Sequence, residues 1–234
     1  MKILKSIGNL AAELLLPSSC LDCGVDLEKS GVVCEKCLKK IKINQTFFCG
    51  ECKARLPEAK KICHQPFPYL LAAAGDYRDP TLQKIILGLK FKFYRGAATA
   101  LGEILIDYIK KIGFVFDGFV IIPIPLHKTR ERERGFNQSL LLSKIVAKEL
   151  GIELAEQVLK RTRNTEPQSG IKDFQKKLRN VSDCFQVVYS EKINGRKILL
   201  IDDVTTSGAT FLAAAEILKK AGAGKIIALA AAKA

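Results

Sequence analysis

Short apolar runs alternate with amphipathic segments after residue 65. The apolar runs are typical of buried or half-buried strands, and they occupy residues 69–77, 118–125, 185–190, 197–203 and 225–232. Segments with a helical spacing of apolar residues lie between several of these runs, at 80–92, 98–112, 137–150 and 209–221. Strands that alternate with helices usually form a parallel sheet that is covered on both faces. The pattern therefore predicts an α/β fold in which helices flank a mostly parallel sheet.

The beginning of the chain follows a different pattern. Residues 1–65 are rich in lysine and cysteine, and the two prolines of HQPFP (64–68) break regular structure before the first predicted strand. We therefore predict a small N-terminal module over residues 1–65 and an α/β domain over 66–234. The opening MKILKSIGNLAAELLLP predicts an amphipathic docking helix rather than a signal peptide, because Glu13 interrupts its apolar run and no small-residue cleavage site follows. Every apolar run is shorter than about 18 residues, so we expect no membrane-spanning segment.

Most of the cysteines gather in one part of the sequence. The chain has 8 cysteines, and all but one fall between residues 20 and 63, mostly in C-x-x-C pairs. This clustering indicates metal binding in a reducing cytoplasm rather than the disulfides of a secreted protein. Cys20-x-x-Cys23 and Cys34-x-x-Cys37 supply four thiolates, which is the donor set of a closed, structural zinc site.

A second set of cysteines supplies only three sulfurs, from Cys49-x-x-Cys52 and Cys63. Three interpretations stay open: His64 completes this site, the site is an empty remnant, or the clustered cysteines pair in a different way. Cys184 lies in an apolar context and is predicted to be an inert thiol in the core. The predicted zinc ligands are Cys20, Cys23, Cys34, Cys37, Cys49, Cys52 and Cys63.

The balance of charge favours a polyanionic partner. The chain carries 38 Lys and Arg residues against 24 Asp and Glu residues, for a formal net charge of +14. Nucleic acid or a small ligand with several phosphates would suit such a charge, and a merely solubilising basic surface is the alternative. Aromatic residues make up only 7% of the chain. We therefore expect no run in which basic and aromatic residues alternate for base stacking. Any contact with nucleic acid should be mainly electrostatic.

The run ILLIDDVTTSGAT (198–210) places polar residues where parallel sheets bind ligands, beyond the carboxyl end of a strand. Asp202 and Asp203 would emerge at the strand tip, where carboxylates can accept hydrogen bonds from a sugar diol or hold Mg²⁺ through water. Gly208 lets a ligand approach the backbone, and the helix that follows presents free N–H groups to an anion. The run thus predicts a site for a ribose phosphate; the alternative is a pair of solvated aspartates before an ordinary Ser/Thr cap.

This run closely resembles the signature by which type I phosphoribosyltransferases bind phosphoribosyl pyrophosphate (PRPP). The resemblance implies that Asp202 and Asp203 are the catalytic acids and contact the ribose hydroxyls. It also implies that the following loop binds the 5′-phosphate, through Thr205, Thr206, Ser207, Gly208, Ala209 and Thr210. Mg²⁺ is expected to bind together with PRPP.

A basic segment follows the apolar run 118–125 and reads LHKTRERERGFNQS. Its positively charged side chains could bind the pyrophosphate. Arg130 and Arg134 would lie on the same face of a helix if the segment were helical. His127 beside them is either a general base or a surface residue that contacts phosphate. An exposed loop of mixed charge is the alternative. The predicted pyrophosphate-side residues are His127, Lys128, Arg130 and Arg134.

Further motifs make the whole chain similar to the ComF family of competence-associated, phosphoribosyltransferase-like proteins. They are RGFNQS, KRTRNTEPQSG, KKLRNVSDCF and the paired N-terminal cysteines. The resemblance implies a type I phosphoribosyltransferase-like fold after an N-terminal double zinc ribbon, with residues 160–181 as a flexible hood over the ligand. The hood could close over phosphates or hold a nucleic-acid backbone, through Arg161, Arg163, Gln168 and Arg179.

The resemblance also implies a function. It implies a cytoplasmic PRPP-binding protein that acts in DNA uptake and natural transformation, with single-stranded DNA and competence or recombination proteins as partners. The alternatives are a metabolic phosphoribosyltransferase that transfers ribose 5-phosphate from PRPP to a base or amine, and a PRPP-sensing regulator without turnover. An enzyme of this kind would displace pyrophosphate from the anomeric carbon, with Mg²⁺ and arginines stabilising the leaving group. The sequence leaves open whether the chain catalyses any reaction.

Overall fold

The structure is a computed structural model that describes residues 19–27, 31–57, 63–64, 66–165 and 183–234. The predicted docking helix within residues 1–18, most of the predicted hood, Gln168 and Arg179 lie outside these ranges. None of the helices in the described ranges is long and apolar enough to cross a membrane.

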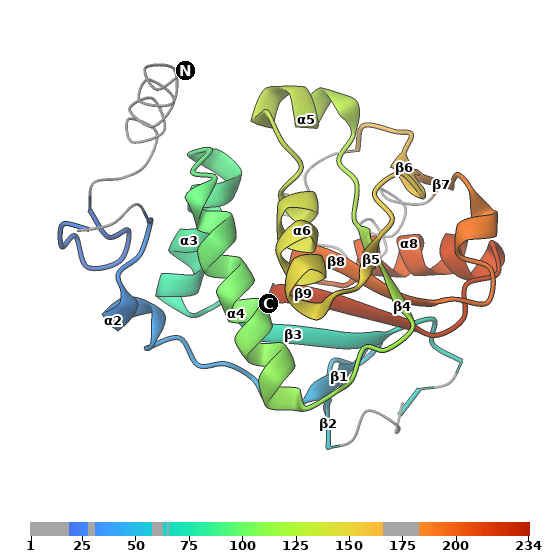
Figure 1. Cartoon of the computed structure of the whole chain (residues 1–234), viewed down its shortest axis with the longest axis horizontal. Coiled ribbons are helices and arrows are strands. Elements are labelled where there is room, and N and C mark those ends of the chain that lie inside the picture. Colours follow the sequence, from blue (N-terminus) through green and yellow to red (C-terminus); the bar gives the residue numbers. More distant parts are fainter. Residues whose placement is uncertain (1–18, 28–30, 58–62, 65, 166–182) are drawn as a thin grey trace.

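A seven-stranded sheet forms the centre of the protein, in the order β2-β1-β3-β9-β8-β4-β5 (Figure 1). The strands from β3 to β5 in this order run parallel, whereas β1 is antiparallel to both β2 and β3. The prediction of a mostly parallel α/β sheet is therefore confirmed. The strands are β1 (Phe47–Cys49), β2 (Arg55–Leu56), β3 (Leu70–Asp76), β4 (Phe119–Pro123), β5 (Glu153–Leu154), β8 (Lys197–Thr205) and β9 (Ile226–Lys233).

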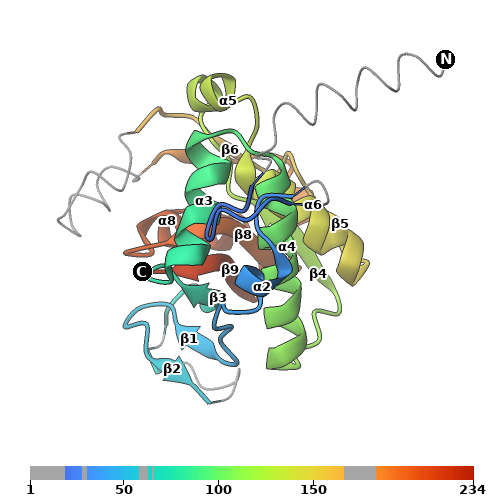
Figure 2. The same cartoon turned by 90° about the vertical axis from the view of Figure 1, so that its left-hand side faces the viewer.

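Both faces of the sheet are covered by helices, because alternate side chains of each central strand point to opposite faces. Along β8, Leu199 and Ile201 pack in one apolar cluster with α3, α4 and α6. Ile198 and Leu200 pack in the other cluster, with α8. Figure 2 shows α4 and α6 on one side of the sheet and α8 on the other. The helices are α2 (Glu35–Leu38), α3 (Pro80–Phe91), α4 (Gly96–Ile112), α5 (Lys128–Arg134), α6 (Gln138–Leu150) and α8 (Ala209–Lys220).

The helix starts follow local sequence signals. Asp79 caps α3 by accepting a hydrogen bond from the amide of Leu82, and Pro80 occupies the first turn, where a missing N–H costs nothing. Asn137 caps α6 in the same way and accepts from the amide of Ser139. Gly135 ends α5 with φ +76°, a conformation that glycine adopts without strain. These caps fix the entry of α6 beside the end of β8.

The apolar run at 185–190 forms a shorter strand, and it lies outside the main sheet. β7 (Phe185–Val187) pairs with β6 (Leu159–Arg161) in a separate two-stranded antiparallel sheet, and a 3₁₀ turn at Ser190–Lys192 follows. Only Phe185 of β7 is buried, whereas β8 is buried along almost its whole length. A strand with a single buried side chain is typical of the periphery of a fold, whereas the central strands of a parallel sheet are buried on both faces.

The cysteine-rich segment contributes directly to the main sheet. Cys49 at the end of β1 pairs with Leu70 of β3, and β2 forms the outer strand (Figure 1). The boundary between residues 65 and 66 stays a prediction, but the two parts share backbone hydrogen bonds across it. The second cysteine set is therefore held against the edge of the α/β sheet.

Candidate functional site

A cavity of about 450 Å³ opens at the carboxyl ends of the central strands. The acid pair at the end of β8 lines it, together with the loop between β8 and α8. Arg130 and Arg134 of α5 line it from another direction, together with Arg161 at the end of β6. The structure thus brings together the predicted acids, the predicted phosphate loop and part of the predicted basic segment.

The acid pair is buried and held in place by hydrogen bonds. Asp202 is 9% exposed and Asp203 is 2% exposed. One Asp202 oxygen, Oδ1, accepts from the hydroxyl of Ser139 at 2.7 Å and from the amide of Asp203 at 2.9 Å. Oδ2 of Asp203 lies 2.8 Å from Nζ of Lys90, at the end of α3. Burial and the neighbouring charge of Asp203 raise the pKa of Asp202 to about 7, against the opposing effects of Lys90 and Ser139.

The loop after the acids lines the cavity. Gly208 precedes α8 with φ +85°, a conformation that other residues adopt only with strain, so the chain can turn sharply into the helix. The side-chain oxygen of Thr205 is buried and has no hydrogen-bond partner within the described residues. Thr205 lines the cavity, so its hydroxyl is available to a bound molecule. The other cavity-lining members of the loop are Thr206, Ser207, Gly208, Ala209 and Thr210.

Two side chains from the other end of the chain support this loop from behind. The hydroxyl of Tyr69 lies 3.5 Å from the carbonyl oxygen of Gly208, and Nζ of Lys53 lies 3.3 Å from the same hydroxyl. A Cβ added to Gly208 would lie 2.6 Å from Nζ of Lys53 and 2.7 Å from the Tyr69 hydroxyl. Burial lowers the pKa of Lys53 to about 8. Lys53 follows Cys52 directly, so it connects the second cysteine set to the predicted phosphate loop.

The basic side of the cavity is a short helix. Arg130 donates a hydrogen bond to the carbonyl of Thr165, and Arg134 donates to Oε1 of Gln138 at 2.6 Å. Burial lowers the pKa of both arginines, while the nearby charges of Asp203 and Asp202 oppose this shift at Arg134. Their guanidinium groups therefore lie in the partly desolvated surroundings in which a charge attracts an anion most strongly.

Three of the predicted ligand-binding residues do not line the cavity, namely His127, Lys128 and Arg163. His127 caps α5 instead, because its Nδ1 accepts from the amide of Thr129 at 3.3 Å. The roles assigned to these residues stay predictions, as do those of Gln168 and Arg179, which lie outside the described ranges.

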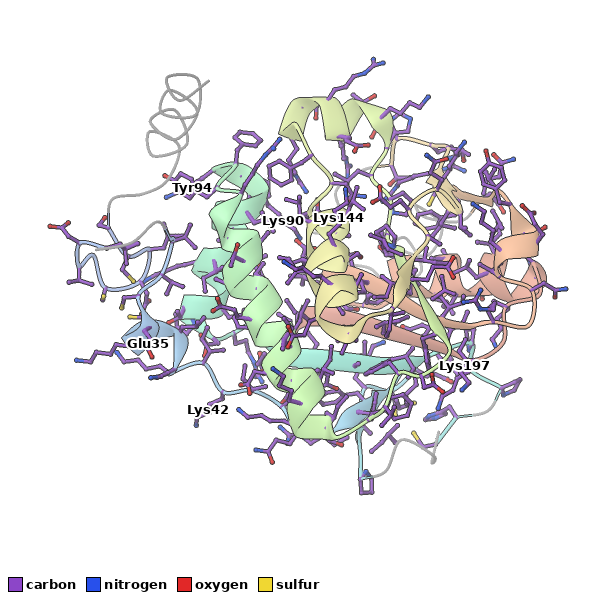
Figure 3. All side chains as sticks on the ribbon, viewed as in Figure 1. Glu35, Lys42, Lys90, Tyr94, Lys144 and Lys197 are labelled. Atoms are coloured by element: carbon purple, nitrogen blue, oxygen red, sulfur yellow. The ribbon has the colours of Figure 1, made fainter. Side chains whose placement is uncertain are left out.

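Lys90 and Ser139 contact the acids but were not predicted from the sequence, and neither was an aromatic segment that lines the same cavity. Residues 90–95 read KFKFYR and begin in the last turn of α3. The expectation that the chain has no alternating basic and aromatic run is therefore wrong. Phe91 and Phe93 line the cavity. Figure 3 shows Lys90 and Tyr94 at the same end of α3. The alternation itself was the signal that could have identified this segment.

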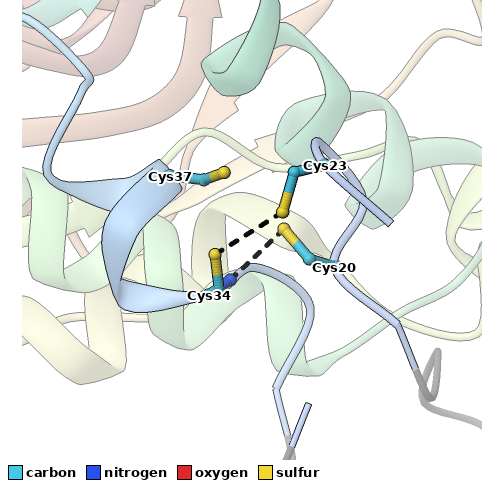
Figure 4. A group of neighbouring side chains, drawn as sticks. All are labelled: Cys20, Cys23, Cys34 and Cys37. Atoms are coloured by element: carbon cyan, nitrogen blue, oxygen red, sulfur yellow. Dashed lines mark hydrogen bonds between the residues drawn. The ribbon is translucent and has the colours of Figure 1, made fainter. Parts of the chain in front are cut away.

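The first cysteine set forms a compact group of four sulfurs (Figure 4). The ligand atoms of Cys20, Cys23, Cys34 and Cys37 all lie within 4.8 Å of one another. The sulfurs of Cys23 and Cys34 are 3.8 Å apart, and a tetrahedral zinc site with bonds of about 2.3 Å places sulfurs about 3.8 Å apart. Although burial acts in the opposite direction, backbone hydrogen bonds lower the pKa of Cys20 to about 6 and thus favour its thiolate. The group fits zinc.

The second cysteine set includes His64. The ligand atoms of Cys49, Cys52, Cys63 and His64 also lie within 4.8 Å of one another. Nδ1 of His64 is 3.5 Å from the sulfur of Cys49 and 3.2 Å from that of Cys63. Of the alternatives considered from sequence, this geometry favours the one in which His64 completes the site. All the cysteines in the described ranges are free thiols.

Comparison with known proteins agrees with this architecture. A family model described as "Phosphoribosyl transferase domain" matches residues 137–234, which include the acid pair and the loop after it. The carboxyl-terminal part of the chain is therefore a domain of the phosphoribosyltransferase class.

Relatives cover nearly the whole chain. Competence protein ComFC of Bacillus subtilis (strain 168) is 31% identical over 209 residues, which span 87% of this chain and 78% of that protein. Competence protein F of Haemophilus influenzae is 28% identical over 218 residues, with 88% and 93% covered. DNA utilization protein YhgH of Escherichia coli (strain K12) is 27% identical over 223 residues, with 91% and 96% covered. The chain belongs to the ComF family of competence proteins.

Proposed function

We propose that this protein binds PRPP together with Mg²⁺ in the cavity at the end of β8, and that it acts in DNA uptake through single-stranded DNA and partner proteins. The observation that carries the proposal is the buried acid pair, Asp202 and Asp203, in one cavity with a loop that offers hydroxyl and backbone donors. Few ligands other than a ribose phosphate need both features so close together.

Each group in the cavity has a role in this proposal. Asp202 and Asp203 accept hydrogen bonds from the ribose hydroxyls, and the loop at 205–210 holds the 5′-phosphate. Arg130 and Arg134 face the pyrophosphate. Nζ of Lys90, 2.8 Å from Oδ2 of Asp203, places a positive charge beside this buried carboxylate. Mg²⁺ would neutralise part of the pyrophosphate charge when it is bound with the ligand.

The names of the relatives support the proposed role in DNA uptake. Two of them are named competence proteins and a third is named a DNA utilization protein. The formal net charge of +14 suits a nucleic-acid partner. The paired cysteine sets would hold zinc and fix the N-terminal part against the sheet, which is a structural role.

Isothermal titration of PRPP with Mg²⁺ tests the binding site. We expect Asp202→Asn/Asp203→Asn to weaken binding on the order of 100-fold, because each hydrogen bond to a charged group contributes about 1.5 to 3 kcal/mol. The double variant also removes negative charge near an anionic ligand, so electrostatic repulsion cannot explain a loss. Glu216→Gln, at an exposed position on α8 remote from the cavity, is the matched control and should bind as the wild type does.

Two further measurements separate the possible functions. Release of pyrophosphate in the presence of a base or amine would favour the metabolic phosphoribosyltransferase. Salt-sensitive binding of single-stranded DNA without pyrophosphate release would favour the proposed role. Equal titration heats for the wild type and the double variant would refute the site.

A further inference from the structure

The segment that joins α3 to α4 is tied to the candidate site at both of its ends. At one end, Nζ of Lys90 contacts Asp203 at 2.8 Å. At the other, Arg95 donates a hydrogen bond of 3.2 Å to the carbonyl of Gly135 and lies over the ring of Phe136, 5.3 Å from its centroid. The side chains between these two ties are therefore held beside the cavity.

Two phenyl rings on this segment are exposed to solvent. Phe91 is 64% exposed and Phe93 is 51% exposed. Both rings line the cavity, together with Tyr77. Phenyl rings are usually buried, and an exposed pair is typical of a binding surface. Most of the other phenylalanines in the described ranges are buried, namely Phe47, Phe48, Phe116, Phe119, Phe136, Phe185 and Phe211.

The backbone at Phe93 is strained. Its φ of +58° lies in the left-handed region, which a bulky residue without a short polar side chain rarely adopts. Such strain persists where the surrounding structure imposes it, and it is concentrated at functional sites. The strain at Phe93 is therefore a second sign, independent of exposure, that the position of this ring matters.

Cations alternate with these rings along the chain. Lys90, Lys92 and Arg95 share the run KFKFYR with the two exposed phenyl rings, and Lys92 is itself exposed. Proteins that bind single-stranded nucleic acid combine such cations, which meet the phosphates, with aromatic rings on which bases stack. Lys90 already contacts Asp203, so Lys92, between the two rings, is the lysine that can bind a phosphate. A free base would need the rings alone, so Lys92 favours a base that is carried on a phosphodiester strand.

We propose that Phe91 and Phe93 form a platform on which a base of single-stranded DNA stacks at the mouth of the cavity. This inference rests on the proposed function, because it gives the single strand a place beside the PRPP site. The acids and the loop at 205–210 would hold the small ligand, while the platform holds the base. One cavity would thus receive both partners.

The test compares two oligonucleotides with the same phosphates: a 20-nucleotide thymidine strand, and an abasic strand of equal length. We expect the wild type to bind the thymidine strand more tightly, by fluorescence anisotropy. Phe91→Ala/Phe93→Ala should lose about 10-fold or more in affinity for the thymidine strand and almost nothing for the abasic strand, since only stacking is removed. The salt dependence should be unchanged in this variant, and reduced in Lys92→Ala.

A second variant guards against a purely structural effect. Phe91→Tyr/Phe93→Tyr keeps the aromatic faces and should bind the thymidine strand nearly as the wild type does. Both double variants should unfold at the same urea concentration as the wild type, because both rings are more than half exposed and contribute little to the core.

The outcomes separate this inference from the proposed function. If the wild type binds both strands equally, the platform is refuted while the DNA-binding role stands. If it binds neither strand, the platform and the DNA-binding role both fall, whereas the PRPP titration still decides the binding site. If thymine alone competes at the rings as strongly as the strand does, the inferred occupant is wrong.

Discussion

At the scale of single residues, the site depends on two carboxylates that the fold treats differently. Asp202 accepts a hydrogen bond from a neutral hydroxyl, whereas Asp203 contacts a lysine. The rise in the pKa of Asp202 follows from that division, since burial acts on it without a direct cationic partner.

The raised pKa of Asp202 predicts a pH-dependent stability. Between about pH 4 and pH 7 the folded protein keeps a proton on Asp202 that the unfolded chain has lost, so the free energy of unfolding falls as pH rises through this range. Asp202→Asn cannot titrate. We therefore expect the free energy of unfolding of this variant, minus that of the wild type, to rise with pH over this range. The rise is at most about 1.4 kcal/mol per pH unit, and the difference should stay constant above the range.

Urea denaturation at intervals between pH 5 and pH 8 measures this difference. Asp117→Asn, at an exposed position before β4, is the control. Its free energy of unfolding should differ from that of the wild type by the same amount at every pH in this range. A difference between Asp202→Asn and the wild type that does not change with pH would show that Asp202 is not protonated in the folded state at neutral pH.

At the scale of elements, the phosphate loop is shaped by contacts that only a glycine allows. Gly208 and Gly113 both have positive φ, +85° and +60°, so alanine would strain the backbone at either position. A Cβ at Gly113 would meet nothing within 4 Å, whereas a Cβ at Gly208 would collide with Lys53 and Tyr69. Alanine at Gly113 therefore tests backbone strain alone, whereas alanine at Gly208 tests strain together with a change in the loop geometry.

We expect Gly113→Ala to destabilise the protein by about 1 kcal/mol and to leave PRPP binding unchanged. Gly208→Ala should cost more stability and weaken PRPP binding by about 10-fold or more, because the loop must move away from the buried Tyr69, whereas the Lys53 side chain can swing aside. Urea denaturation and titration calorimetry on the two variants check this. Equal effects on binding would mean that the loop geometry does not depend on Lys53 and Tyr69.

The elements also show what the sequence could predict. The acids and the loop lie within nine consecutive positions, 202–210, so a local pattern was enough to identify them. Ser139 reaches Asp202 across 63 positions, and Tyr69 reaches Gly208 across 139. No local pattern encodes such contacts. The main helices begin and end within two residues of their predicted ends, since their apolar spacing and caps are local signals.

The strand predictions that failed did so because strand pairing depends on contacts between segments that are distant in the sequence. The strand predicted at 185–190 is real only for Phe185–Val187, and its partner is Leu159–Arg161 rather than the main sheet. β1 and β2 are too short for a periodic pattern to reveal, and they form because β3 offers an edge on which to pair. Periodicity identifies a strand, but it does not say which neighbour completes it.

At the scale of the whole molecule, the second cysteine set connects the N-terminal part to the site. The amide of Lys53 donates to the carbonyl of Cys49 at 3.1 Å, and its side chain contacts the Tyr69 hydroxyl that lies against Gly208. A metal held by Cys49, Cys52, Cys63 and His64 would therefore also hold Lys53 against the loop.

Removal of that metal should loosen the loop. We expect Cys63→Ser to make the backbone amides of residues 206–210 exchange with deuterium several-fold faster than in the zinc-loaded wild type, because the support behind Gly208 is lost. Cys23→Ser, in the other cysteine set, is the matched control and should leave this exchange unchanged. Hydrogen exchange measured by mass spectrometry on the full chain makes the comparison, and unchanged exchange in Cys63→Ser would exclude the connection.

The contact between Lys90 and Asp203 supplies the acid pair with an internal counter-ion. A ligand that brings Mg²⁺ would not simply add a positive charge beside the acids, since one is already present. Its arrival would be an exchange of one cation for another, and only the difference between the two would count toward affinity. A free metal ion would gain little from such an exchange, so this lysine favours a cation that arrives already bound to a polyphosphate.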